Sequence, residues 1–127
     1  MSRQLAAFEL PFPPSVNHCW RRGSRRTYMS AAGKAYRQNV IAAVWSLYGK
    51  PKPWTCLLEL AMDFEPPTSA TYDLDNYFKA SIDAMVHAGL MVDDKQIKKI
   101  TAEMHAKNPP GRVVVEVFEL DRPHENR

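Results

Sequence analysis

The sequence predicts a small α/β protein in which a mixed β-sheet packs against two main helices. Two segments carry apolar residues at helical spacing, several others resemble strands, and the order along the chain is β, long loop, α, β, α, short β, β, β. A length of 127 residues and a hydrophobic content of 45% fit one globular domain over residues 1–127.

The composition argues against several classes of protein. No apolar run reaches the roughly 18 residues that cross a membrane, and no long apolar stretch precedes the N-terminal prolines, so we expect neither a membrane span nor a signal peptide. Cys19 and Cys56 show no CxxC spacing, which argues against a disulfide scaffold or a zinc site. We therefore expect a cytoplasmic protein with reduced thiols.

The first half of the chain is predicted to contain a strand, a long loop and a helix. LAAFEL (Leu5–Leu10) is typical of a short strand, and residues 11–26, with three prolines and two Arg pairs, predict an extended or turn-rich loop. Ser30 is the expected N-cap of a helix that runs to about Tyr48, where GKPKP ends it. Apolar residues recur on this helix at helical spacing: Tyr36, Val40, Val44 and Leu47 or Tyr48.

The second half is predicted to contain the second helix between strands. Residues 54–65 predict a strand, because apolar residues alternate with mostly acidic ones over its second half. The apolar side chains that share one face are Leu58, Leu60, Met62 and Phe64. A helix from about residue 75 to 87 is expected to end at Gly89, which occupies the C-terminal cap position. Residues 96–107 and 112–120 are strand-like and flank the turn sequence NPPG, so we expect them to pair as a hairpin.

Two aspartates meet at the start of the second helix. Asp73 and Asp75 flank Leu74, so their side chains point the same way if this tripeptide is extended. Capping and the helix dipole both favour a carboxylate at a helix N-terminus, but only one residue can occupy the cap. Further along, Asp75, Lys79 and Asp83 form one stripe at four-residue spacing.

A second acidic pair, Asp93 and Asp94, follows residues 90–92, a short apolar segment that we expect to form a strand. If this strand lies beside the end of the 54–65 strand, its carboxylates approach the first acidic pair and repel it unless a cation is bound. Mg²⁺ prefers oxygen ligands of this kind and retains several waters. D-x-D alone is weak support for a metal site.

Lys79 lies one turn beyond Asp75, at the rim of such a site, where its ammonium group can meet a phosphate or an attacking water. The alternative is an ion pair with Asp75 or Asp83, worth about 0.3–0.5 kcal/mol. Asp63 and Glu65, at the end of the neighbouring strand, are reserve metal ligands.

The charge is divided unevenly along the chain. Residues 1–53 contain nine Lys or Arg against one Glu, whereas residues 54–127 contain eight Lys or Arg against thirteen Asp or Glu. One explanation is a basic half that binds a polyanion and an acidic half that binds cations, and the other is an unevenly charged solvated surface.

DLDNYFKASIDAMVHAGLMVDD (residues 73–94) resembles the signature of the RusA-type crossover (Holliday) junction endodeoxyribonucleases of bacteria and their phages. The likeness extends to LPFPPSVNHCWRRG and SAAGKAYRQNV, which match the Pro-rich entry and first-helix segments of that family, so it covers most of the chain in the same order. The combination of D-L-D-N, a Lys four residues after the second Asp, a Gly at the helix end and D-D is quite specific.

The resemblance implies a cytoplasmic, homodimeric, Mg²⁺-dependent DNase, bacterial or phage-encoded, that resolves four-way DNA junctions in recombination and repair. By the same motif, Asp73, Asp75 and Asp94 correspond to metal-binding catalytic aspartates. Lys79 corresponds to an essential lysine, and only the resemblance favours Asp94 over Asp93 as the third ligand. DNA contacts are implied for the early loop: Ser15, Val16, Asn17 and His18.

Two departures from the family pattern concern DNA contact. The family can carry an arginine run before the first aspartate, where this chain reads TSATY, and two consecutive Asn in the early loop, where Val16 precedes Asn17 here. Trp20 either stacks on an unpaired base at the junction centre or anchors the loop. Phosphate contacts are expected from basic residues of the first half: Arg21, Arg22, Arg25, Arg26, Lys34 and Arg37.

The resemblance implies hydrolysis of two opposed phosphodiesters by a homodimer, leaving 5′-phosphate and 3′-hydroxyl ends. An isologous dimer would place its two identical sites suitably for the two nicks. The first helix and the C-terminal hairpin are the candidate dimer surfaces. One alternative is a non-catalytic junction- or DNA-binding protein whose carboxylates only cap, which predicts metal-independent binding without cleavage. The other is a less specific metal-dependent nuclease of branched DNA.

Overall fold

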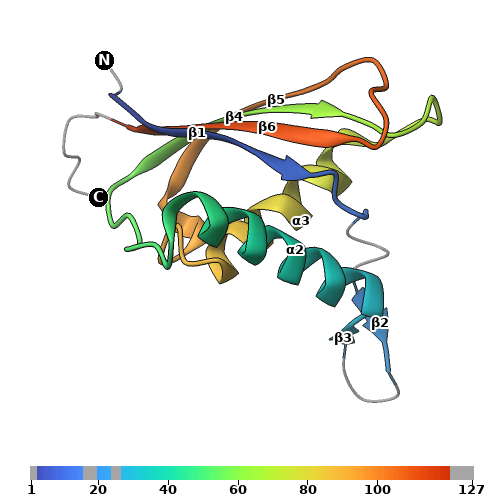
Figure 1. The fold of residues 1–127 in the computed structure, drawn as a ribbon, viewed down its shortest axis with the longest axis horizontal. Coiled ribbons are helices and arrows are strands. Elements are labelled where there is room, and N and C mark those ends of the chain that lie inside the picture. The colour runs from blue at the N-terminus through green and yellow to red at the C-terminus, as the bar shows by residue number, and fades with distance from the viewer. Residues whose placement is uncertain (1–2, 16–19, 24–26, 121–127) are drawn as a thin grey trace.

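The fold is a four-stranded sheet with two helices on one face (Figure 1). The structure, a computed structural model, describes residues 3–15, 20–23 and 27–120, without the side chains of residues 21 and 22. This confirms the predicted mixed sheet and two main helices in a small α/β domain. The sheet strands are β1 (Arg3–Pro11), β4 (Leu58–Glu65), β5 (Ile97–Met104) and β6 (Arg112–Glu119), and the helices are α2 (Ala31–Tyr48) and α3 (Leu74–His87).

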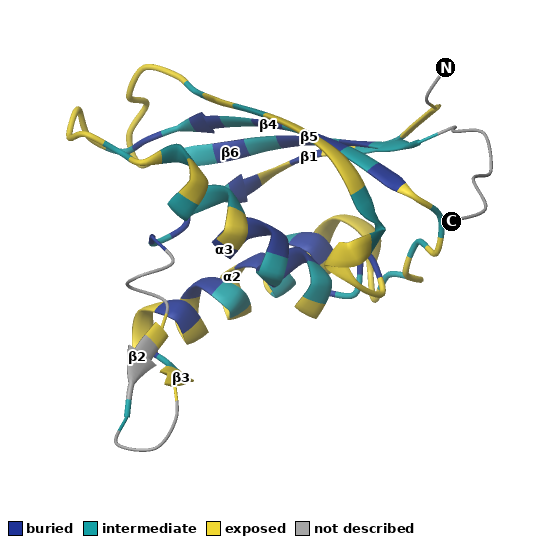
Figure 2. Ribbon diagram, turned by 180° about the vertical axis from the view of Figure 1, so that it is seen from behind, coloured by how far each residue is buried: buried dark blue, intermediate teal, exposed yellow. Residues whose placement is uncertain are grey.

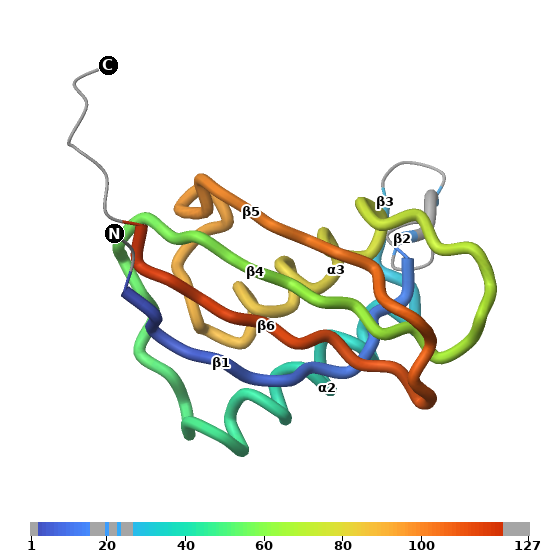
Figure 3. The backbone as a smooth tube through the Cα atoms, turned by 90° about the horizontal axis from the view of Figure 1, so that it is seen from above, coloured from blue at the N-terminus to red at the C-terminus, as the bar shows by residue number. Residues whose placement is uncertain are grey.

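The strand order is β1-β6-β4-β5, which Figure 3 shows from above the open face of the sheet. β6 pairs antiparallel with both β1 and β4, whereas β5 pairs parallel with β4. Two parallel neighbours need a crossover connection, and α3 provides it between β4 and β5. Two short strands, β2 (Trp20–Arg22) and β3 (Thr27–Met29), form a separate hairpin that projects from the start of α2 (Figure 1).

The predicted hairpin of the last two strands is wrong, because β4 lies between β5 and β6. The connection crosses the end of β4 instead of reversing beside β5. The His105 N–H donates to the Phe64 carbonyl at 2.8 Å, and the Asn108 N–H donates to the Pro66 carbonyl at 2.8 Å. The NPPG turn itself is confirmed by a 2.7 Å hydrogen bond from the Gly111 N–H to the Asn108 carbonyl.

The core lies between the sheet and the helices, and Figure 2 shows the buried sides of α2 and α3 turned toward the strands. Alternate residues of β4 and β6 supply most of the sheet side, as expected of strands with one covered face. Fully buried side chains include Val40 and Val44 of α2, Leu58, Leu60, Met62 and Phe64 of β4, Met85 of α3, and Val113, Val115 and Val117 of β6.

Both helices begin and end near the predicted residues. The Ser30 side chain caps α2 by accepting a hydrogen bond from the Gly33 N–H at 3.1 Å. Gly89 follows α3 with φ of +90°, a backbone conformation that favours glycine and lets the chain leave the helix. No helix within the described ranges is long and apolar enough to span a membrane.

Residues 90–92 do not form the predicted strand. Met91 makes only an isolated parallel bridge with Trp54, whose N–H donates to the Leu90 carbonyl at 2.9 Å. This contact precedes β4, which starts at Leu58, so the segment lies at the amino end of β4 and not beside Glu65 as expected. The acidic pair that follows opens a short 3₁₀ helix, η1 (Asp94–Gln96).

Candidate active site

Asp73 and Asp75 stand together at the first turn of α3. Asp73 is the N-cap residue, but its side chain accepts no hydrogen bond from a helix N–H; its Oδ2 instead accepts one from Asn76 Nδ2 at 3.3 Å. A hydrogen bond with the Asp75 carboxyl group and the negative charge of that group raise the pKa of Asp73. Two exposed carboxyl groups thus repel each other at the positive end of a helix, and a cation would relieve that repulsion.

Lys79 lies one turn further along α3 with an exposed side chain. Within the described part of the chain it forms no ion pair, so the predicted alternative of a bond to Asp75 or Asp83 is not made. Asp83 bonds instead to Arg37 of α2, with Nη2 to Oδ2 at 2.8 Å, and lies 3.9 Å from His87 Nε2. The Lys79 ammonium group is therefore available to an anion that approaches α3.

The adjacent aspartates Asp93 and Asp94 have different environments. Asp93 caps η1: its Oδ1 accepts a hydrogen bond from the Lys95 N–H at 2.8 Å, and this contact lowers its pKa. Gln96 completes the cap by accepting from the Asp93 N–H at 2.9 Å, and it donates to the Trp54 carbonyl at 2.8 Å. A hydrogen bond with Asp93, followed by desolvation, raises the pKa of Asp94.

Asp94 and Lys79 line one cavity of about 380 Å³, although Asp94 lies fifteen positions further along the chain. The charge of Asp83 reaches this carboxyl group too and adds to the rise in its pKa. The structure thus places Asp94 beside the middle of α3, while the first acidic pair lies at the helix start. Among the described residues, the oxygens of Asp73, Asp75 and Asp94 do not all lie within 4.8 Å of one another.

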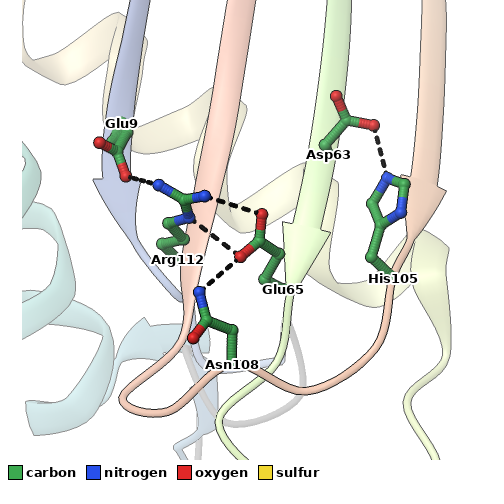
Figure 4. A network of polar contacts seen from close by, with 6 residues as sticks. All are labelled: Glu9, Asp63, Glu65, His105, Asn108 and Arg112. Atoms are coloured by element: carbon green, nitrogen blue, oxygen red, sulfur yellow. Dashed lines mark hydrogen bonds and ion pairs between the residues drawn. The ribbon is translucent and has the colours of Figure 1, made fainter.

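A different cluster of metal-ligating side chains lies on the open face of the sheet, and Figure 4 shows two of its members, Asp63 and His105. In the described ranges, Asp63, Glu103 and His105 bring one ligand atom each within 4.8 Å of the others, so this group could hold a metal ion. His105 Nε2 lies 2.8 Å from Asp63 Oδ1, and His105 Nδ1 lies 3.6 Å from Glu103 Oε2. The hydrogen bond with Asp63 raises the pKa of His105, and these contacts also form an ion-pair network that needs no metal.

Glu65, the second reserve ligand, is already bound by neighbours. Arg112 donates to it twice, from Nε at 3.0 Å and from Nη2 at 3.1 Å, and Asn108 Nδ2 donates at 2.7 Å (Figure 4). The Arg112 hydrogen bonds lower the pKa of Glu65. Arg112 also pairs with Glu9 of β1. These residues cross-link three strands, which makes Glu65 a structural group.

The family model described as endodeoxyribonuclease RusA matches residues 11–118 of this chain. The chain belongs to the RusA endodeoxyribonuclease family. Its similarity to the crossover junction endodeoxyribonuclease RusA of Enterobacteria phage HK97 is 34% identity over 118 residues, covering 90% of this chain and 94% of the relative. The proteins of the same name from Enterobacteria phage 82 and Escherichia coli strain K12 are 34% and 33% identical over 114 residues, covering 87% of this chain and 92% of each relative.

The residues expected to contact DNA, some from the family resemblance and the others from their positive charge, are only partly placed. Ser15 is buried at the end of the Pro-rich segment, Lys34 is exposed on α2, and Arg37 is half-buried against Asp83. Several others lie outside the described residues or have undescribed side chains: Val16, Asn17, His18, Arg21, Arg22, Arg25 and Arg26. The DNA contacts of this loop therefore stay a prediction.

Two features of this RusA-family site escaped the sequence analysis. The sequence D-D-K-Q contains a capping box from Asp93 to Gln96, and recognising it would have assigned Asp93 to capping. The Arg37–Asp83 bond joins α2 to α3 beside Lys79. No sequence pattern predicts this bond, because the rotation of α2 and α3 relative to each other decides which of their side chains meet.

Proposed function

We propose that this chain is a Mg²⁺-dependent endodeoxyribonuclease that resolves four-way DNA junctions by paired nicks. Membership of the RusA family supports the reaction class, and the names of the relatives supply the substrate. The observation that carries the proposal is the pair Asp73 and Asp75: the Asp73 carboxyl group makes no capping bond and its pKa is raised by its neighbour. Such a pair is a ready site for a divalent cation.

Asp73 and Asp75 would hold the metal ion directly. Mg²⁺ is commonly bound by only one or two carboxylates and keeps several waters, so Asp94 can act through a water molecule without moving to the start of α3. When bound, the ion would lower the pKa of a coordinated water and neutralise charge on the phosphate. Asp93 is the weaker candidate for the third position because its carboxylate already accepts the Lys95 N–H.

Lys79 would bind a non-bridging oxygen of the scissile phosphate. It lies one turn from Asp75 on the exposed side of α3, and among the described residues it has no carboxylate partner to leave before it meets the substrate. Charge builds on the phosphoryl oxygens during attack by water, and an ammonium group in place beforehand stabilises that charge. The products would be a 5′-phosphate and a 3′-hydroxyl.

A homodimer would supply the second nick. A four-way junction has approximate two-fold symmetry, and an isologous dimer presents two identical sites related in the same way. The C-terminal end of α2 carries three exposed apolar residues, Trp45, Leu47 and Tyr48, which suits a contact between copies. In the cell this activity would serve DNA recombination and repair.

The test compares cleavage of a synthetic four-way junction with cleavage of a linear duplex of matching sequence. We expect symmetrical nicks on the junction, dependent on Mg²⁺, and at least about 100-fold slower cleavage by Asp75→Asn because metal-derived stabilisation is worth several kcal/mol. Asp63→Asn is the matched control, since it removes an exposed carboxylate from the other candidate cluster. Loss of activity in Asp63→Asn with full activity in Asp75→Asn would place the metal on the open sheet face. Metal-independent binding without nicks would indicate a non-catalytic junction-binding protein.

A further inference from the structure

The cavity that holds Lys79 and Asp94 has walls from four separate parts of the fold. Trp20 and Met29 line it from the β2–β3 hairpin, Gly33 and Tyr36 from α2, Phe78 and Ile82 from α3, and Ile100 from the edge strand β5. Its volume of about 380 Å³ is at the small end of the range for sites that take small organic groups. A single planar ring system fits such a space better than a protein segment does.

Two apolar side chains of this cavity are exposed. Trp20 and Ile100 are each 39% exposed, so both lie at the opening of the cavity and not in the hydrophobic core. Trp20 and Met29 are paired across the hairpin and share the side that faces the cavity. Tyr28, the next residue along β3, is 50% exposed and does not line the cavity, as the alternation of a strand requires.

The charged groups of the cavity suit a nucleotide. Arg37 and Asp83 neutralise each other through their 2.8 Å contact, which leaves Lys79 and Asp94 as the other charged groups of the cavity. In the proposed function Asp94 serves the metal ion, so Lys79 is the group that can bind a phosphate beside the apolar walls. In addition, the chain is strongly basic around Trp20, with Arg21 and Arg22 directly after it. A contact between two copies through this hairpin would gather charges of the same sign, so the composition of this segment favours a polyanion over a second copy of the chain.

We propose that this cavity receives one unstacked nucleobase of the branched DNA, with the Trp20 indole stacked on the base and Lys79 on the adjoining phosphate. This inference rests on the proposed function and adds a base-binding subsite to it. Extruding a base costs least where its stacking is already interrupted, as at a branch point. Stacking on an aromatic side chain then offsets the cost, so the subsite would favour branched over linear DNA.

The experiment places 2-aminopurine at the branch point of a synthetic four-way junction, or within one arm as a reference. All variants carry Asp75→Asn, which keeps the DNA intact during measurement. We expect binding to change the fluorescence of the branch-point probe and not that of the arm probe. Trp20→Ala should abolish this change and weaken junction binding by about 5- to 150-fold, the equivalent of one lost stacking contact.

Three comparisons decide the outcome. Trp20→Phe should restore most of the signal, because it keeps a stacking ring. Tyr28→Ala should behave like the parent, because it removes an exposed aromatic ring from the same hairpin outside the cavity. Ile100→Trp should block the opening and lose the signal while Trp20 stays in place.

An unchanged branch-point signal in both Trp20→Ala and Ile100→Trp would overturn the subsite. So would a change in oligomeric state as the main effect of Trp20→Ala, measured by sedimentation, because the cavity would then be an interface between copies. Nicking of the junction by the protein without these substitutions is measured in parallel. Intact nicking with no base signal refutes the subsite alone, whereas absent nicking refutes the proposed function.

Discussion

Removal of the Tyr36 hydroxyl group tests how α2, α3 and β1 are held in register around the candidate site. This hydroxyl donates to the Pro11 carbonyl at 3.1 Å and lies 3.2 Å from the hydroxyl of Ser81, which is fully buried. Tyr36→Phe keeps the ring and leaves the buried Ser81 hydroxyl and the half-buried Pro11 carbonyl short of a partner. A buried group without its hydrogen bond costs about 1–3 kcal/mol. Because Ser81 also has the Tyr77 carbonyl at 3.4 Å, we expect a loss of about 1–2 kcal/mol.

Urea unfolding at a fixed protein concentration measures this loss, which corresponds to a decrease in Tm of about 4–8 °C for a chain of this size. Tyr28→Phe is the matched control, because Tyr28 is 50% exposed and should change stability by less than about 0.5 kcal/mol. A double-mutant cycle with Ser81→Ala should show coupling between the two hydroxyls. Equal losses in Tyr36→Phe and Tyr28→Phe, or zero coupling, would refute the proposed three-way link.

Three further predictions concern the acidic pair, the open sheet face and one turn. Because the pKa of Asp73 is raised, this residue contributes to the stability of the metal-free protein below its unfolded pKa, and the contribution is lost as pH rises through its folded pKa. Asp75→Asn should remove this loss and give a flatter plot of Tm against pH. An unchanged plot would contradict the prediction. The Asp63 hydrogen bond raises the pKa of His105, so its contribution is complete below about pH 6.5 and disappears as pH rises through the folded pKa. His105→Asn should lose that pH dependence, and an NMR titration showing an ordinary His105 pKa would argue against the contact. Gly111 has φ of +93°, and an added Cβ would lie 2.9 Å from side-chain atoms of both Phe12 and Pro67. Gly111→Ala should therefore lower the free energy of unfolding by about 1–3 kcal/mol, measured by urea unfolding. A neutral effect would mean that the turn can rearrange.

The helices and the central strand β4 could be predicted from the sequence because their signals are local. α2 has a capping serine at its start and buries Tyr36, Val40 and Val44 at helical spacing, as predicted. β4 alternates strictly, with Leu58, Leu60, Met62 and Phe64 all buried. In each case one residue pattern determines which side of the element meets the core.

The strand order could not be predicted in the same way, because pairing joins residues that are far apart in the chain. A turn between two strands suggested a hairpin, yet β6 inserts between β1 and β4. One signal was present: β6 reads RVVVEVFE, and its outward residues Val114 and Phe118 are half-buried. A nearly continuous apolar strand is typical of the middle of a sheet, and weighing that feature would have favoured a central position.

The candidate site was predictable where it depends on one helix and not where it depends on packing. Asp73 and Asp75 interact at the helix start as the D-x-D spacing predicted. Asp94 was expected to approach Asp73 and Asp75 from the end of a strand over residues 90–92. That strand does not form, and η1 places Asp94 beside Lys79 instead. The cavity they share needs the hairpin, two helices and an edge strand to meet, which no single segment encodes.

The two faces of the molecule differ in what they offer to DNA. On the open sheet face, Glu9 and Glu65 are bound by Arg112, and Asp63 is bound by His105, so Arg112 and His105 already have acidic partners. Lys79 and the hairpin lie on the helix side. In the proposed function, metal-free carboxylates at the start of α3 repel the same phosphates that Lys79 attracts. Metal and DNA should therefore each raise the affinity for the other by the same factor, because a coupling free energy between two bound ligands is reciprocal.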